Sequence, residues 1–321
     1  MPEAEGRDLS IERSELPPSA RVENFTWRGD RDALLNACRE ADAILTDYVP
    51  FDRAVIEKLR CCRFISVAAT GWDCVDTAAA ARRGIAVSAV GEYCTDEVAD
   101  HVLALLLTLN RQILAYDEQV RVRHSFRWNE VTGLRRLAGQ TLGLIGFGRV
   151  GRAVCRRALG FAMAVLAYDP KVDAATITDH GARPAGLDEL LAGADIISLH
   201  SNLDAGSRGL LNRAAFAKMA HRPLILNVAR GALIDESALV EALDRGLVAG
   251  AGLDVLTEDS PDLARHPLAG RRDVLLTPHV AFYSESALAD LRRISARNIR
   301  AFLDGRPGEI FRLVTPAWGG A

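Results

Sequence analysis

The fold of this chain is decided by the stretch TLGLIGFGRVG at residues 141–151. Its first five residues are apolar or small and predict a buried strand, and the glycine pattern that follows leads into a predicted helix at 150–159. In such a turn Gly146 allows the tight bend, Gly148 lets the backbone approach a ligand, and Gly151 lets the helix pack on the strand. The stretch therefore predicts a strand–turn–helix unit whose helix N-terminus can bind a phosphate group.

An acidic residue, Asp169, follows the next apolar run, AVLAY at 164–168, and lies 23 residues after Gly146. A spacing of about 20 residues is typical of the carboxylate that accepts hydrogen bonds from the ribose of a bound dinucleotide. This carboxylate would repel a 2′-phosphate, so it favours NAD over NADP, although Lys171 lies close by. The alternative is a glycine turn beside a surface aspartate. The pattern predicts an NAD site that includes Gly146, Gly148, Arg149, Val150, Gly151 and Asp169.

Apolar runs and helical patterns alternate on both sides of this unit. Before it, runs at 43–46, 64–68 and 85–87 alternate with helical patterns at 32–41, 52–59 and 77–83; after it, runs lie at 164–168, 196–199, 224–227, 250–253 and 274–276. Such alternation, with strands apolar along their whole length, predicts parallel sheets covered on both faces. We therefore expect an α/β fold with two Rossmann-like, doubly wound parallel-sheet domains. Thr95 is expected to cap the helix leading into the second domain, and a long helix at 284–303 to return to the first, which makes the first domain discontinuous.

The composition excludes several classes of function. The net charge is −3, and the 39 basic and 42 acidic residues are well mixed. The sequence therefore has no basic stripe of the kind that would predict direct binding to nucleic acid. The longest apolar run, at 102–107, is far shorter than the ~20 residues of a membrane span. The N-terminus MPEAEGRDLS lacks the apolar segment of a secretory signal. The six cysteines are scattered without CxxC or zinc-site spacing, which favours reduced thiols in a cytoplasmic protein and no metal site.

Several ordered segments resemble the D-isomer-specific 2-hydroxyacid dehydrogenase family: LIGFGRVG at 144–151, NVARGALID at 227–235, GLDV at 252–255 and TPH at 277–279. Within it, the segments EGRDLSIERSEL at 5–16, HSNL at 200–203 and HVAFYSE at 279–285 resemble the C-terminal binding proteins. The resemblance covers nearly the whole chain. It implies a substrate-binding domain at 1–96 and 285–321 and an NAD-binding domain at 97–284.

The function implied is the NAD-dependent interconversion of a small 2-keto acid and a D-2-hydroxy acid by hydride transfer. The alternative is an NAD(H)-binding regulatory or corepressor-like protein with weak dehydrogenase activity. A phosphonate or formate-type oxidoreductase of the same superfamily would differ only in its substrate.

Arg230 and His279 are the candidate catalytic residues, because each follows a predicted strand, where α/β sheets bind ligands. A planar guanidinium suits a carboxylate, and a histidine that titrates near neutral pH can donate a proton to a carbonyl and take it back. The resemblance implies an acid that pairs with the histidine and raises its pKa. In the family this acid lies five residues after the aspartate of the GLDV segment, a position that Asp259 occupies here. The alternatives are that Glu258 pairs with His279 or that neither acid does.

Further contacts are implied by the resemblance, residue by residue. The backbone of Thr70 and Gly71 would hold the substrate carboxylate, while Trp72 and Phe282 are the aromatic side chains expected near the substrate. Trp72 could equally be an ordinary core residue. At the nicotinamide, Asp254 is expected to bind the amide, and Val228 and Ala229 to line the ring. On the adenosine side the expected contacts are His200, Ser201, Asn202 and Leu203. Asn202 and Leu203 could also be plain loop residues.

Three further expectations concern substrate and assembly. The loop VAATGWDC at 67–74 has no Lys or Arg, which argues against a phosphorylated substrate and leaves an apolar or aromatic side chain as a hypothesis. The segment 111–136 matches the region through which the family dimerises, so a homodimer is expected. Only MPEA precedes the matching N-terminal segment, so no regular strand is expected within residues 1–8.

Overall fold

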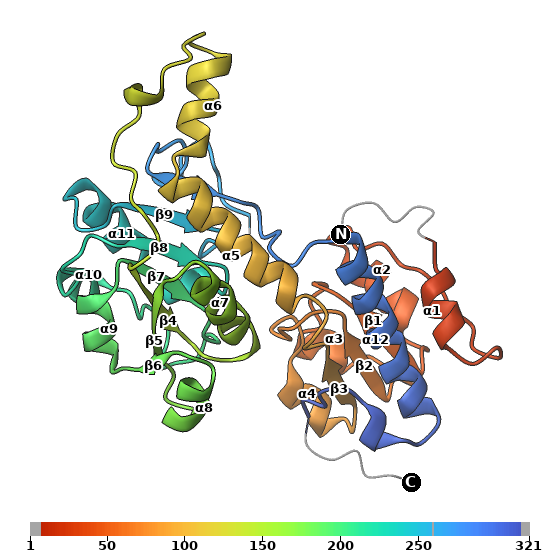
Figure 1. Ribbon diagram of the computed structural model, residues 1–321. Coiled ribbons are helices and arrows are strands. Elements are labelled where there is room, and N and C mark those ends of the chain that lie inside the picture. The colour runs from red at the N-terminus through yellow and green to blue at the C-terminus, as the bar shows by residue number, and fades with distance from the viewer. Residues whose placement is uncertain (1–7, 259, 316–321) are drawn as a thin grey trace. The chain divides into compact units, whose positions relative to one another are not determined.

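The chain forms two compact units in a computed structural model that describes residues 8–258 and 260–315 (Figure 1). The first unit comprises Met1–Tyr93 and Ser284–Ala321, and the second unit comprises Cys94–Tyr283. The prediction of no strand at 1–8 falls almost wholly outside the described residues. Both units contain parallel sheets with helices between the strands, so the predicted α/β class is confirmed.

The first unit contains three parallel strands in the order β1 (Ala43–Thr46), β2 (Phe64–Val67) and β3 (Ala86–Ala89). One face is covered by α2 (Arg31–Cys38), α3 (Arg53–Ile56) and α4 (Thr77–Arg82), whose apolar residues share a buried cluster with alternate strand residues such as Ile65. On the other face α12 (Glu285–Leu303) packs against β2, where the rings of Phe302 and Phe64 stack with centroids 4.7 Å apart. The helix at the end of the chain therefore belongs to the same core as the first strands.

The second unit contains seven parallel strands in the order β10-β9-β8-β7-β4-β5-β6. The chain runs outward from β4 to β6, returns to place β7 on the other side of β4, and continues to β10. This reversal makes the sheet doubly wound, and doubly wound sheets bind their ligands where the strand order reverses, here at the carboxyl ends of β4 and β7. The strand bounds are β4 (Thr141–Ile145), β5 (Ala164–Tyr168), β6 (Arg183–Pro184), β7 (Ile196–Leu199), β8 (Leu224–Asn227), β9 (Gly250–Leu253) and β10 (Val274–Leu276).

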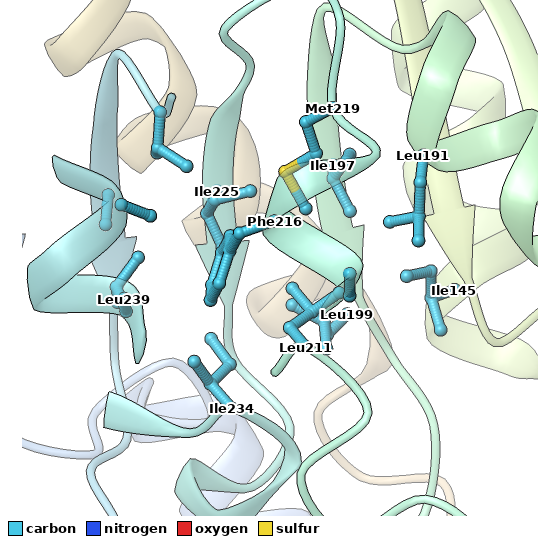
Figure 2. Close-up of a cluster of buried hydrophobic side chains, with 14 of the residues drawn as sticks. Ile145, Leu191, Ile197, Leu199, Leu211, Phe216, Met219, Ile225, Ile234 and Leu239 are labelled. Atoms are coloured by element: carbon cyan, nitrogen blue, oxygen red, sulfur yellow. The ribbon is translucent and has the colours of Figure 1, made fainter. Parts of the chain in front are cut away.

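Helices cover both faces of this sheet. On one face α5 (Thr95–Asn110) and α7 (Arg149–Gly160) pack against each other and on the strands. On the other, α9 (Leu187–Gly193), α10 (Arg213–Ala217) and α11 (Glu236–Asp244) bury their apolar side chains against β4, β7 and β8 (Figure 2). Each fully buried Leu or Phe stabilises the fold by about 1.5–3 kcal/mol, so this layer holds the strand ends in place. The unit also contains the short helices α8 (Ala174–Asp179), η1 (Trp128–Glu130) and η2 (Gly231–Leu233).

The start of α5 corrects one prediction. Thr95 is the first helical residue and not its cap; Cys94 takes the cap position, and its side chain makes no capping hydrogen bond to the helix. At the other end Gln112, with φ of 54°, separates α5 from α6 (Ile113–Arg121), and Figure 1 shows α6 extending away from the end of α5. In the part of the chain that the structure describes, no single helix has the length and apolar character of a membrane span; α5 and α6, bent by 59°, meet these criteria only as a pair.

Candidate active site

The glycine turn between β4 and α7 is closely packed on its protein side. Gly146 has φ of +99°, and a Cβ there would lie 2.6 Å from the carbonyl carbon of His200. A Cβ on Gly151 would lie 2.3 Å from the carbonyl oxygen of Gly146, so no side chain fits at either position. A Cβ on Gly148 would meet no atom within 4 Å. The turn is therefore tight against the protein and open at Gly148, as a phosphate-binding turn requires.

Asp169 is held next to this turn by two backbone amides. Its Oδ2 accepts a hydrogen bond from the Phe147 amide at 2.8 Å, and its Oδ1 accepts one from the Lys171 amide at 2.9 Å. The Lys171 ammonium lies 3.3 Å from Asp204 Oδ2, so this cation is engaged by another carboxylate. Gly148 caps α7 without a side-chain hydrogen bond, which leaves the helix N-terminus accessible to an anion. These residues fit the phosphates and adenosine ribose of NAD.

The loop after β7 lies against the same turn. His200 is half-buried, with Nε2 2.9 Å from Ser198 Oγ, and its Nδ1 is buried without a hydrogen-bond partner among the described residues. Burial lowers the pKa of His200 to about 3, so the ring is neutral at physiological pH. Ser201 Oγ donates to the carbonyl oxygen of Ile145 at 3.2 Å, whereas Asn202 is exposed. The backbone of His200 and Ser201 lies directly against Gly146, where it leaves no room for a Cβ.

Arg230 is positioned by a buried amide that sequence reasoning missed. Asn227 ends β8 with no exposed surface; its Oδ1 accepts the Ala229 amide at 3.0 Å, and its Nδ2 donates to the Arg230 carbonyl at 2.9 Å. Arg230 itself donates from Nη1 to the Ala229 carbonyl at 2.8 Å. Val228 is buried and Ala229 half-buried in the same turn. The only sequence signal for this role is an asparagine at the end of an apolar strand, directly before the arginine.

His279 lies on a turn after β10 with an unusual backbone. Its φ is 54°, in the left-handed region that few residues other than glycine adopt. Its amide donates to the Asp254 carbonyl at 2.8 Å, which ties this turn to the end of β9. The Phe282 ring lies edge-on to the imidazole with centroids 6.2 Å apart. The structure thus brings predicted residues Asp254, His279 and Phe282 together.

The Asp254 carboxylate is buried and bonded to the same turn. Its Oδ1 accepts from Thr277 Oγ1 at 2.6 Å and from the Val280 amide at 2.9 Å, and its Oδ2 accepts from the Ala281 amide at 2.9 Å. These bonds use three of about four acceptor positions of a carboxylate. The expected hydrogen bond between the Asp254 carboxylate and a nicotinamide amide would therefore use the one remaining acceptor position of that carboxylate.

Glu258, one of the two acids considered as the partner of His279, lies elsewhere. It is exposed and lines an open hollow of about 580 Å³ together with Glu236, Arg265 and His266. Neither Arg230 nor His279 is among the described residues that line this hollow. The other acid, Asp259, lies outside the described residues, so the pairing of Asp259 with His279 stays a prediction.

The predicted substrate loop of the first unit is held at its start by segments that follow neighbouring strands. The Ala68 amide donates to the Thr46 carbonyl at 2.6 Å, and the Val90 amide donates to the Ala69 carbonyl at 2.9 Å. Among the described residues, the amides of Thr70 and Gly71 have no hydrogen-bond partner, so they are available to a carboxylate.

Trp72, in the same loop, packs against the buried cluster of the first unit, which favours its reading as a core residue. The guanidinium of Arg312 lies 4.7 Å from the centroid of the Trp72 ring. Arg312 thus brings a cation to a loop that has none in its own sequence. Because Arg312 lies far from this loop along the chain, the sequence alone gave no sign of the contact.

Comparison with known proteins agrees with this geometry. Residues 103–281 match the family described as D-isomer specific 2-hydroxyacid dehydrogenase, NAD binding domain. A hydroxypyruvate reductase from Blautia hydrogenotrophica is 35% identical, with 94% of both chains covered. A D-3-phosphoglycerate dehydrogenase from Mycobacterium bovis is 37% identical over 86% of this chain and 52% of its own. The crystal structure of a D-lactate dehydrogenase from Aquifex aeolicus with NAD and lactic acid is similar, with a TM-score of 0.81, 28% identity and coverage of 88% and 89%. The chain therefore belongs to the D-isomer specific 2-hydroxyacid dehydrogenase family.

Proposed function

We propose that this protein is an NAD-dependent D-2-hydroxyacid dehydrogenase, which interconverts a small 2-keto acid and the D-2-hydroxy acid. The observation that carries the proposal is the placement of Arg230 and His279 at the carboxyl ends of β8 and β10, on the sheet edge where the glycine turn follows β4. Ligands of doubly wound sheets bind at this edge. The regulatory alternative is not favoured, because the relatives described above are named as a reductase or dehydrogenases.

In this proposal the protein provides binding and proton transfer. NAD, held by the turn at 146–151 and by Asp169, supplies or accepts the hydride when it is bound. Arg230 binds the substrate carboxylate and polarises the adjacent carbonyl. His279 donates a proton to the carbonyl oxygen during reduction and takes it back during oxidation.

We further propose Asp259 as the acid that pairs with His279. The exposed Glu258 lines a different hollow, so it is the weaker candidate.

The proposed substrate is an unphosphorylated 2-keto acid with an apolar or aromatic side chain. The loop at 67–74 carries no cation of its own, and the Arg312 guanidinium beside it lies over the Trp72 ring. Arginine and lysine form strong, charge-assisted hydrogen bonds to phosphate, and their absence from this loop favours an uncharged substituent on the substrate.

We also propose a cytoplasmic homodimer. The cytoplasmic location rests on the scattered, unpatterned cysteines. The dimer rests on apolar side chains that are exposed along residues 111–136, where Phe126 is 93% and Trp128 84% exposed. Exposed aromatic groups gathered on one segment mark a protein interface. Sedimentation of the wild type and of Trp128→Asp tests this, with dimers expected only for the wild type.

The test of the activity is NADH oxidation with hydroxypyruvate, glyoxylate, pyruvate, phenylpyruvate and phosphohydroxypyruvate. We expect turnover of unphosphorylated acids to D-products, and a fall in kcat of about 100- to 10,000-fold in His279→Gln with NADH binding retained. Arg230→Lys should raise KM, because an ammonium cannot form the paired hydrogen bonds of a guanidinium. His221→Gln, an exposed histidine near Asp195, is the matched control. No turnover of any acid would refute the proposal, and preference for phosphohydroxypyruvate would refute its substrate assignment.

A further inference from the structure

The backbone of the His279 turn is bonded to one residue, Asp254, through its carbonyl and its side chain. Three successive amides converge on Asp254: that of His279 donates to its carbonyl at 2.8 Å, and those of Val280 and Ala281 donate to its two carboxylate oxygens at 2.9 Å. His279 has φ of 54°, and a non-glycine residue keeps such a backbone only where the surrounding structure enforces it. Asp254 therefore fixes the direction in which His279 leaves the backbone.

Asp254 is in turn oriented by two residues. Thr277 Oγ1 donates to Asp254 Oδ1 at 2.6 Å, and His101 Nε2 lies 2.9 Å from Thr277 Oγ1 and 3.6 Å from Asp254 Oδ1. A hydroxyl has a single proton, which Thr277 gives to the carboxylate. His101 Nε2 must therefore carry a proton and donate it to Thr277.

The donors come from rigid parts of the second unit. His101 lies in the middle of α5, which packs on β9, the strand that Asp254 directly follows. The Asp254 side chain has no exposed surface, and the His101 side chain is 21% exposed. Hydrogen bonds to a buried carboxylate are strong, since water does not compete for them.

We propose that His101 and Thr277 are positioning residues for His279, acting through Asp254. This inference rests on the proposed role of His279 in proton transfer. The two donors stop the carboxylate from rotating, so that it keeps the Val280 and Ala281 amides, and with them the imidazole, in the orientation that proton transfer needs. Neither residue has to touch substrate or cofactor.

The experiment compares Thr277→Val, which keeps the shape and removes the hydroxyl, with Thr277→Ser, which restores it. Thr178→Val is the matched control, since that hydroxyl bonds only to a carbonyl within α8. In full-length protein, kcat and KM are measured with the best keto acid, NADH affinity by fluorescence, and amide exchange on a peptide covering 277–283. We expect Thr277→Val to lower kcat at least about tenfold, with NADH affinity kept within about twofold and faster exchange in that peptide. Thr277→Ser should restore both readouts, and His101→Phe should shift them in the same direction as Thr277→Val.

Two outcomes overturn the inference. One is a Thr277→Val enzyme with a lower Tm but an unchanged kcat, which would mean a purely structural role. The other is unchanged exchange of the 277–283 amides. Amide exchange can be measured without turnover, so it tests the anchoring of the turn separately from the activity. If the wild type is inactive but Thr277→Val still speeds exchange of the 277–283 amides, the proposed function is refuted and the anchoring of the turn by Thr277 is supported.

Discussion

The buried ring nitrogen of His200 predicts a specific loss of stability in acid. In an unfolded chain a histidine has a pKa of about 6.5, whereas burial lowers the pKa of His200 in the folded protein to about 3. Between these values the unfolded state binds a proton that the folded state does not. The contribution of His200 to stability is therefore fully present above about pH 6.5 and is lost progressively as the pH falls towards 3.

The magnitude follows from the two pKa values. Lowering the pH from about 7.5 to about 5.5 should cost about 1.4 kcal/mol through this residue alone. For a unit of this size the corresponding fall in Tm is about 3–6 °C. Other titrating groups add to the total, so only a difference between variants isolates the histidine.

The assay is calorimetry of the wild type and His200→Gln at several pH values over this range. A glutamine has no charge to acquire, so the variant should lose about 3–6 °C less than the wild type on acidification. His221→Gln, in which an exposed histidine is replaced, should lose as much as the wild type. Equal losses in the wild type and His200→Gln would refute the reasoning, as would an NMR titration of the His200 ring with a midpoint near pH 6.

Three further outcomes are expected. Gly151→Ala should weaken NADH binding at least about tenfold in a fluorescence titration, because its Cβ meets a backbone oxygen at 2.3 Å; Gly160→Ala, where a Cβ meets no atom within 4 Å, should bind NADH normally. Asp169→Ser should raise the kcat/KM ratio of NADPH to NADH about tenfold, since a carboxylate repels a 2′-phosphate, and an unchanged ratio would contradict its role. Glu12→Gln should destabilise the first unit by about 3 kcal/mol in urea unfolding, because Glu12 pairs with Arg292 through two hydrogen bonds at 2.7 and 2.6 Å and both side chains are largely buried.

Most of the fold could be predicted because apolar runs mark buried strands. The predicted strands at 43–46, 141–145, 164–168 and 224–227 have the observed bounds. Strand β6 was missed, because a two-residue edge strand containing Pro184 leaves no periodic pattern. The cap of α5 was misplaced by one residue, since Thr95 has the composition of a cap but the backbone of a first turn.

The candidate site could be predicted only where its chemistry lies in a contiguous motif. The turn at 146–151 and Asp169 are of this kind. Asn227 and His101 escaped notice because their roles depend on hydrogen bonds that form only in the folded chain. Arg312 is brought to Trp72 by the return of the chain to its first unit, which no local spacing encodes.

The order β10-β9-β8 has a consequence for how such an enzyme can diversify. Arg230, Asp254 and His279 follow these three adjacent strands, so their separations are set by strand spacing, about 4.8 Å per step, and not by the lengths of the connections between them. Those connections can gain or lose residues without moving the proposed reaction centre. The loop at 67–74 belongs to the other unit and to a separate sheet. The proposed substrate loop and the proposed reaction residues thus lie in separate units, and a graft of that loop from a relative tests whether it sets substrate preference.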